Sequence, residues 1–154
     1  MKKLVLAIAA ILTLSAPAAF AAEHAGHDMS SGHAAMGGAA HEEVIDGVKA
    51  TFNVQTMADA MKSMGMEMPK GVKETHHISV AFKDVKSGKA LTEGEVKVKV
   101  QNPDKSDQSK DLMGMHGHFG TDVVMTAKGK YGVMCKFKLA DGKVRSAKFW
   151  YTVK

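Results

Sequence analysis

Alternation of apolar and polar residues is the feature that most constrains the fold of this chain. Between residues 131 and 139 every second residue is apolar: Tyr131, Val133, Cys135, Phe137 and Leu139. Successive side chains of a β-strand point to opposite faces, so this pattern predicts a strand with one buried face. The same alternation recurs at 48–54, 76–82, 96–100 and 144–153. About seven such strands with turns between them predict an all-β fold, a β-sandwich over residues 44–154.

One short methionine-rich helix is expected after the first strand. Thr56 and Asp59 have the spacing of a capping box, and Gly65 supplies a stop about two turns later. Met57 and Met61 share one helical face, where methionine often fills gaps in a core. Some of the three methionines that follow are expected to be available to a metal: Met64, Met66 and Met68.

The first 21 residues have the features of a secretory signal peptide. Two lysines precede an apolar run at 4–14, and Ala-Phe-Ala at 19–21 fits a cleavage site. The run is shorter than the roughly 20 residues of a membrane span. We therefore expect a periplasmic or secreted mature chain that begins at Ala22 and has no transmembrane segment.

Residues 22–43 form a tract of small residues with no apolar periodicity, and a flexible tail is expected there. Histidine-rich tracts in secreted tails are typical of metal capture. The side chains expected to capture metal here, with Cu(II) as a candidate, are His24, His27, Met29, His33, Met36 and His41.

The charge of the chain gives little support to a polyanionic partner. Without Lys2 and Lys3 the basic count falls from 21 to 19 against 16 acidic residues, so the formal charge falls from +5 to +3. Four lysines occupy alternate strand positions, which is typical of a solvated sheet face: Lys97, Lys99, Lys136 and Lys138. We expect no nucleic-acid partner.

Residues 112–120, Leu-Met-Gly-Met-His-Gly-His-Phe-Gly, place two thioethers and two imidazoles close together. Thioether sulfur suits Cu(I) and imidazole suits both oxidation states of copper, so this donor set favours copper over magnesium, calcium or manganese. In a flat strand the methionines and histidines would point to opposite faces, so a turn is required, and Gly114 and Gly117 permit one. The predicted ligands are Met113, Met115, His116 and His118.

Two further histidines and the one cysteine leave alternatives open. His76 has the parity of the apolar residues of its strand, so it is either a satisfied interior histidine or a ligand at the end of that strand, and His77 is a second candidate ligand. Cys135 lies on an inward-facing position, which favours a buried inert thiol over a ligand. A single cysteine excludes an intramolecular disulfide.

The chain resembles the YtkA-like group of small secreted β-sandwich domains, which is similar to the FixH-like and copper-resistance CopC-like proteins. The resemblance covers roughly residues 44–154, and it implies an immunoglobulin-like sandwich with a role in periplasmic copper handling. A spaced His and Met pattern like that of the copper chaperones for cytochrome oxidase is not found, so no delivery target is implied. The residues that carry the resemblance are Met113-Gly114-Met115-His116-Gly117-His118, Gly129-Lys130-Tyr131 and Phe149-Trp150-Tyr151.

Two classes of function follow from these patterns. The first is a copper-binding protein, a chaperone or a buffer, that works with a periplasmic or membrane copper-handling protein. The second is a non-catalytic interaction module whose Met-rich surface contacts a protein partner. An enzyme is disfavoured, because the sequence offers no set of nucleophile, base and orienting residue and no phosphate-binding glycine loop.

Overall fold

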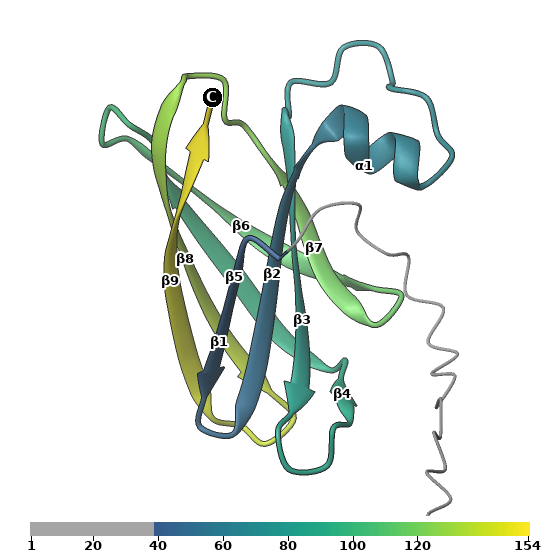
Figure 1. Cartoon of the computed structure of the whole chain (residues 1–154), viewed down its shortest axis with the longest axis vertical. Coiled ribbons are helices and arrows are strands. Elements are labelled where there is room, and N and C mark those ends of the chain that lie inside the picture. Colours follow the sequence, from purple (N-terminus) through teal and green to yellow (C-terminus); the bar gives the residue numbers. More distant parts are fainter. Residues whose placement is uncertain (1–38) are drawn as a thin grey trace, which may run out of the picture. The chain divides into compact units, whose positions relative to one another are not determined.

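Nine antiparallel strands and one helix account for the fold of residues 39–154, the part of the chain that the computed structural model describes (Figure 1). The elements are β1 (His41–Ile45), β2 (Val48–Thr56), α1 (Met57–Ser63), β3 (His76–Asp84), β4 (Ala90–Leu91), β5 (Gly94–Gln101), β6 (Asp107–Met115), β7 (His118–Val123), β8 (Gly129–Leu139) and β9 (Val144–Val153).

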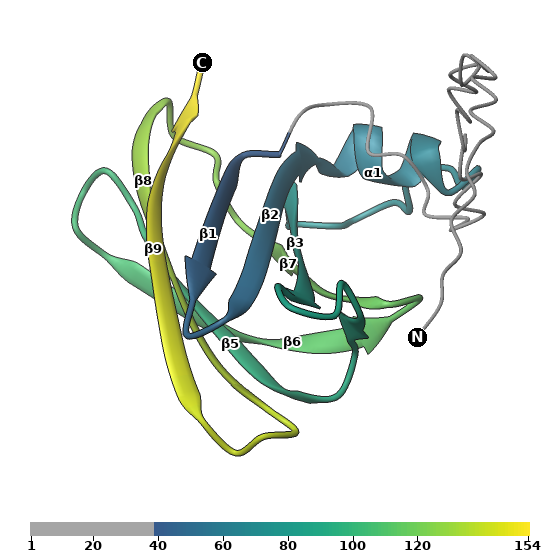
Figure 2. The same ribbon diagram turned by 60° about the horizontal axis from the view of Figure 1, so that its bottom comes forward.

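The strands pair in the order β1-β2-β3-β7-β6-β5-β8-β9, and β4 pairs with β3. Strand β6 joins two layers, because residues 107–112 pair with β5 and residues 113–115 pair with β7. We call β1, β2, β3, β4, β7 and the end of β6 the first sheet, and β5, β8, β9 and the start of β6 the second sheet. Figures 1 and 2 show β1 beside β9, so the sandwich is nearly closed on its other side.

The core lies between the two sheets and is built from the alternating apolar residues. The side chain of Phe82 bridges the layers, with its ring centroid 5.7 Å from that of Phe119 in the first sheet and 4.4 Å from that of Phe137 in the second. Aromatic pairs at such separations add to the stability that burial provides. The inward parity expected for β8 is confirmed, since Tyr131, Val133, Cys135, Phe137 and Leu139 are all buried. The predicted all-β, immunoglobulin-like β-sandwich is thus confirmed.

The described residues, 39–154, form nine strands where about seven were expected. Residues 44–54 form two strands, because Asp46 and Gly47 have φ values of 46° and 77° and make a tight turn between β1 and β2. Positive φ at both central residues is typical of a two-residue hairpin with the sequence Asp-Gly. Residues 107–110, which lack the apolar alternation of the other strands, also belong to a strand, β6, and pair with β5.

The boundary expected for the tail also needs correction. Strand β1 begins at His41, and the imidazole of His41 stacks on the ring of Phe149 with a centroid distance of 5.1 Å. His41 therefore belongs to the sheet and not to a flexible tail that ends at residue 43. The predicted signal peptide and five of the tail ligands lie outside the described residues: His24, His27, Met29, His33 and Met36.

The predicted helix is confirmed as α1. Its N-cap is Thr56, whose hydroxyl oxygen accepts a hydrogen bond of 3.1 Å from the backbone N–H of Asp59. Helix α1 ends at Ser63, and Gly65 follows with a φ of 67°. Met57, the first residue of the helix, is buried, and Met61 is half-buried. Within residues 39–154, no helix has the length and apolar character needed to cross a membrane.

Cys135 is buried on the inward face of β8, as expected. Burial disfavours the charged thiolate and raises the pKa of the Cys135 thiol to about 12. Because thiolate is the form that binds metals and reacts, this thiol is inert at neutral pH.

Burial separates structural methionines from accessible ones and predicts their effects on stability. The side chain of Met57 is 3% exposed and that of Met113 is 74% exposed. Replacement of Met57 by Ala should lower the free energy of unfolding by about 2–5 kcal/mol, whereas Met113→Ala should change it by less than about 0.5 kcal/mol. Urea unfolding of the two metal-free variants measures this difference. Equal losses would contradict the assignment of Met57 to the core.

Candidate metal centre

The predicted turn lies between β6 and β7 and is made by His116 and Gly117. Their φ values are 44° and 86°. Positive φ at both central residues defines a type I′ turn, whose twist matches that of the strands it joins. Met115 and His118, the residues that flank the turn, are directly opposite each other in the register.

This register places several polar and thioether side chains on one face of the first sheet. Directly opposed residues of an antiparallel pair point to the same face. Met113 pairs with Gly120, Met115 pairs with His118, and Asp122 pairs with His77 on the other side of β7. The residues that alternate with them are buried in the core: Leu112, Phe119, Val123, His76 and Ile78. The outer face therefore carries a cluster from three adjacent strands, which we call the outer cluster: His77, Met113, Met115, His118 and Asp122.

His77 and Met115 approach each other over Gly120. A methyl group added to Gly120 would lie 2.8 Å from Nε2 of His77 and 3.5 Å from Cε of Met115. The imidazole from β3 and the end of the methionine side chain from β6 thus both lie over the backbone of β7 at Gly120. A residue larger than glycine would occupy the space in which the two side chains meet.

Asp122 fixes the orientation of the His77 ring. Nδ1 of His77 lies 2.6 Å from Oδ1 of Asp122, and because the carboxylate accepts, Nδ1 carries the hydrogen. The side chain of His77 is mostly covered. Nε2, the nitrogen that points toward Gly120, is then the unprotonated nitrogen of the neutral ring. A histidine held by a carboxylate at one nitrogen and free at the other is typical of metal ligands.

His118 is half-buried beside these residues. Desolvation lowers the pKa of His118 most, the neighbouring His77 lowers it further, and a hydrogen bond with the backbone of His116 acts in the opposite direction. A lowered pKa keeps His118 neutral, which is the form that binds metal ions.

His76 lies on the other face of β3 and is separated from the outer cluster by the sheet. Its ring is buried and makes an edge contact with Tyr151 at a centroid distance of 5.9 Å. The hydroxyl of Thr75 accepts a hydrogen bond from the backbone N–H of Met125 and lies 2.8 Å from Nδ1 of His76. The hydroxyl hydrogen is thus available to Nδ1. Of the two alternatives for His76, the structure supports a satisfied interior histidine.

The other predicted ligands are accessible but are not gathered at one point. Met113 and His116 are exposed at the hairpin. The segment between α1 and β3 exposes three thioethers, those of Met64, Met66 and Met68. Figures 1 and 2 both show α1 on the side of the sandwich toward which the β6–β7 hairpin extends.

Sequence reasoning missed Asp122 and Gly120. Both share the parity of His118 in β7, with Gly120 two residues and Asp122 four residues after it. Their proximity to His77 depends on the register between β3 and β7. That register cannot be predicted from local sequence patterns. Within residues 39–154, no group of three His, Cys, Asp or Glu side chains is arranged to hold a metal ion. The outer cluster differs from such groups because a thioether is part of it.

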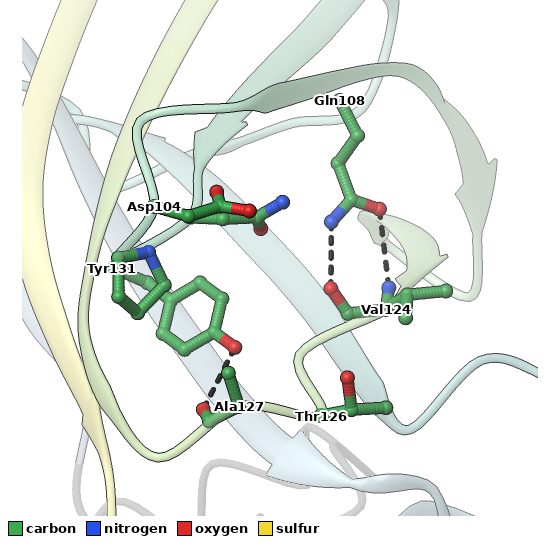
Figure 3. A pocket seen from close by; sticks show the side chains of 8 residues that line it. Asp104, Gln108, Val124, Thr126, Ala127 and Tyr131 are labelled. Atoms are coloured by element: carbon green, nitrogen blue, oxygen red, sulfur yellow. Dashed lines mark hydrogen bonds between the residues drawn. The ribbon is translucent and has the colours of Figure 1, made fainter.

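A separate hollow of about 430 Å³ lies at one end of the sandwich (Figure 3). The amide of Gln108 already makes two hydrogen bonds to the backbone of Val124, and the hydroxyl of Tyr131 donates to the carbonyl of Ala127. The carboxylate of Asp104 accepts hydrogen bonds from Ser106. The buried Oδ1 of Asn102 is the exception, since it has no hydrogen-bond partner. Because no imidazole or thioether lines the hollow, it is a poorer candidate for a copper site than the outer cluster.

The fold is similar to that of several solved structures. A copper-bound variant of FetP from uropathogenic Escherichia coli strain F11 superposes with a TM-score of 0.58 and 14% identity, over 74% of this chain and 94% of FetP. A copper-bound variant of Campylobacter jejuni P19 gives a TM-score of 0.56 and 13% identity, over 75% and 96%. A DUF4426 family protein from Pseudomonas aeruginosa PAO1 gives 0.55 and 10%, over 73% and 96%. The chain matches no protein-family profile and no curated protein sequence.

The close approach of His77 to Gly120 predicts different effects for two glycine substitutions. In Gly120→Ala the new methyl group must displace the His77 ring, whereas in Gly114→Ala it would contact the ring of Phe119 at an ordinary 3.7 Å. The ring-nitrogen resonances of His77 in the metal-free protein should therefore shift in Gly120→Ala and stay unchanged in Gly114→Ala. Nuclear magnetic resonance of the imidazole nitrogens measures both. An unchanged His77 spectrum in Gly120→Ala would show that Gly120 does not set the ring position.

Proposed function

We propose that this protein binds copper through the outer cluster and acts as a non-catalytic carrier or buffer of Cu(I). The proposed ligands are His77, Met115 and His118, with Met113 and His116 at the margin of the site. The observation that carries the proposal is that Nε2 of His77 and the terminal methyl group of the Met115 thioether side chain both reach the space over Gly120. Cargo copper would be held on an open strand surface that a partner could reach.

The chemistry of these donors supports Cu(I) over harder cations. A thioether is an uncharged, soft ligand and imidazole is a borderline one, whereas magnesium and calcium prefer carboxylate and carbonyl oxygens. The carboxylate of Asp122 is already bound to Nδ1 of His77, so it supports the imidazole ligand in this proposal.

The comparisons support a copper-related role without identifying ligands. The FetP and P19 structures that share this fold are described as copper-bound. A further FetP structure was obtained from protein expressed in the periplasm. With the leader expected at residues 1–21, we propose a periplasmic location for this chain as well. Sequence identities of 13–14% support a shared fold but do not identify equivalent metal ligands. The proposed ligands are therefore assigned from the geometry of this chain.

The exposed methionines provide a second set of soft donors. The segment after α1 has a methionine at every second position, and all three are exposed to solvent: Met64, Met66 and Met68. We propose that this segment transfers Cu(I) to or from the outer cluster, and that the tail ligands, with His24 and His27 first among them, capture copper for it. The same exposed thioethers also suit the alternative, a surface for a protein partner without copper.

The direct test of the proposed function compares two conservative methionine substitutions. Both are made in the leader-free chain with alanine at the five tail ligands outside the described residues. Met115→Leu removes the sulfur at the outer cluster, and Met125→Leu removes it in the core, where the side chain is 1% exposed. Cu(I) titration against a competing chelator should give an affinity at least about tenfold lower for Met115→Leu, which corresponds to one lost ligand contact of about 1.4 kcal/mol.

Met125→Leu should bind Cu(I) as the parent protein does. Unchanged affinity in Met115→Leu would overturn the proposed ligand set. If the parent protein with its intact outer cluster bound no Cu(I) at all, the interaction module would be the better account of the exposed methionines.

A further inference from the structure

The outer face of the second sheet, opposite the outer cluster, carries an excess of positive charge. Outward positions of β5, β6, β8 and β9 hold three acidic side chains: Glu95, Asp107 and Asp111. They also hold six lysines: Lys97, Lys99, Lys130, Lys136, Lys138 and Lys148. The positive charge is unevenly distributed over this face, because two of the acids form ion pairs with lysines of β5. These pairs are Lys97–Asp111 at 3.2 Å and Lys99–Asp107 at 2.6 Å.

The half of this face formed by β8 and β9 contains no acidic residue. Its outward positions are Lys130, Gly132, Met134, Lys136 and Lys138 in β8 and Val144, Ser146, Lys148, Trp150 and Thr152 in β9. We call these ten residues the basic face. Lys136 lies directly opposite Lys97 and Ser146, and Lys148 lies opposite Met134. Like charges in direct opposition destabilise a sheet, so the Lys97–Lys136 pair does not serve the stability of the fold, whereas Lys138 lies opposite Glu95.

Trp150 is exposed on the basic face, where it lies opposite Gly132 in the last third of β9. Its side chain is 48% exposed, and Lys130 and Lys148 place their ammonium groups 4.9 and 5.3 Å from its ring centroid. The indole rests on Gly132, where an added methyl group would lie 3.0 Å from the ring. The indole thus lies against the backbone of β8 at Gly132.

The composition of the basic face fits an anionic bilayer better than a protein partner. Tryptophan is enriched at the headgroup level of membranes, and lysines near the surface are attracted to anionic lipids. Lysine is depleted from protein–protein interfaces, even though tryptophan is enriched there. An exposed tryptophan flanked by two lysines, with two further lysines and no acid in the same two strands, matches the membrane case.

We propose that the basic face docks reversibly on anionic phospholipid membranes. Trp150 inserts at the headgroup level, while the lysines contact lipid phosphates. The outer cluster lies on the opposite sheet and stays exposed to water when the protein is docked. This inference does not depend on copper binding, because none of the proposed ligands belongs to the basic face.

The experiment uses the leader-free protein, whose one tryptophan is Trp150. Vesicles of phosphatidylglycerol and phosphatidylcholine in equal parts should shift its emission to shorter wavelength, and vesicles of phosphatidylcholine alone should not. Lys136→Glu with Lys148→Glu should weaken co-sedimentation with the anionic vesicles at least about tenfold. The control pair Lys83→Glu with Lys89→Glu makes the same charge change at exposed positions of β3 and its following loop, and should retain most of the binding.

Three outcomes would overturn the proposal. The first is no binding to anionic vesicles. The second is an equal loss in the control pair, which would mean that net charge alone attracts the protein. The third is a shift of Trp150 emission with soluble polyglutamate but not with vesicles, which would identify an acidic protein as the partner. Circular dichroism of both double variants checks that they are folded, and Lys136→Glu places an opposite charge across from Lys97, which favours folding.

Discussion

The register between β6 and β7 is the constraint on which the outer cluster depends. The two-residue turn at His116 and Gly117 fixes that register, since a slip by one residue would move Met115 into the core and Leu112 to the surface. With the register fixed, β7 carries His118, Gly120 and Asp122 on one face, and β3 adds His77 beside them. A hairpin turn of two residues thus determines which donors can meet.

In the first sheet, the side chains that stabilise the fold and the proposed copper ligands occupy alternate positions along the strands. Inward positions of the first sheet supply the core, including the buried ring of His76, and outward positions supply His77 and Met115. Ligand substitutions on the outward face therefore leave the packing of Phe82 against Phe119 and Phe137 intact. Two successive histidines in one strand have different roles because adjacent residues point to opposite faces.

The sequence predicted local features better than relations between distant strands. The alternation in β8, the Thr56 cap of α1 and the turn within residues 112–120 could all be predicted, because each depends on residues close together in the chain. The Asp46-Gly47 turn is also a local feature, since Asp-Gly is typical of a hairpin turn. Strand β6 is harder to predict from the sequence, because its first half carries exposed polar side chains without apolar alternation. The contacts of His77 with Asp122 and Gly120 span 45 and 43 residues and depend on a pairing that no local pattern reveals.

X-ray absorption at the copper edge tests most directly the claim that imidazole and thioether share one Cu(I) ion. The sample is the leader-free chain with alanine at the five tail ligands outside the described residues, loaded with less than one equivalent of Cu(I). The account predicts both nitrogen and sulfur in the first coordination shell, with the nitrogen contribution lowered by His77→Ala and the sulfur contribution lowered by Met115→Leu. A shell of sulfur alone, unchanged by His77→Ala, would contradict it and would move the copper site to the exposed methionines.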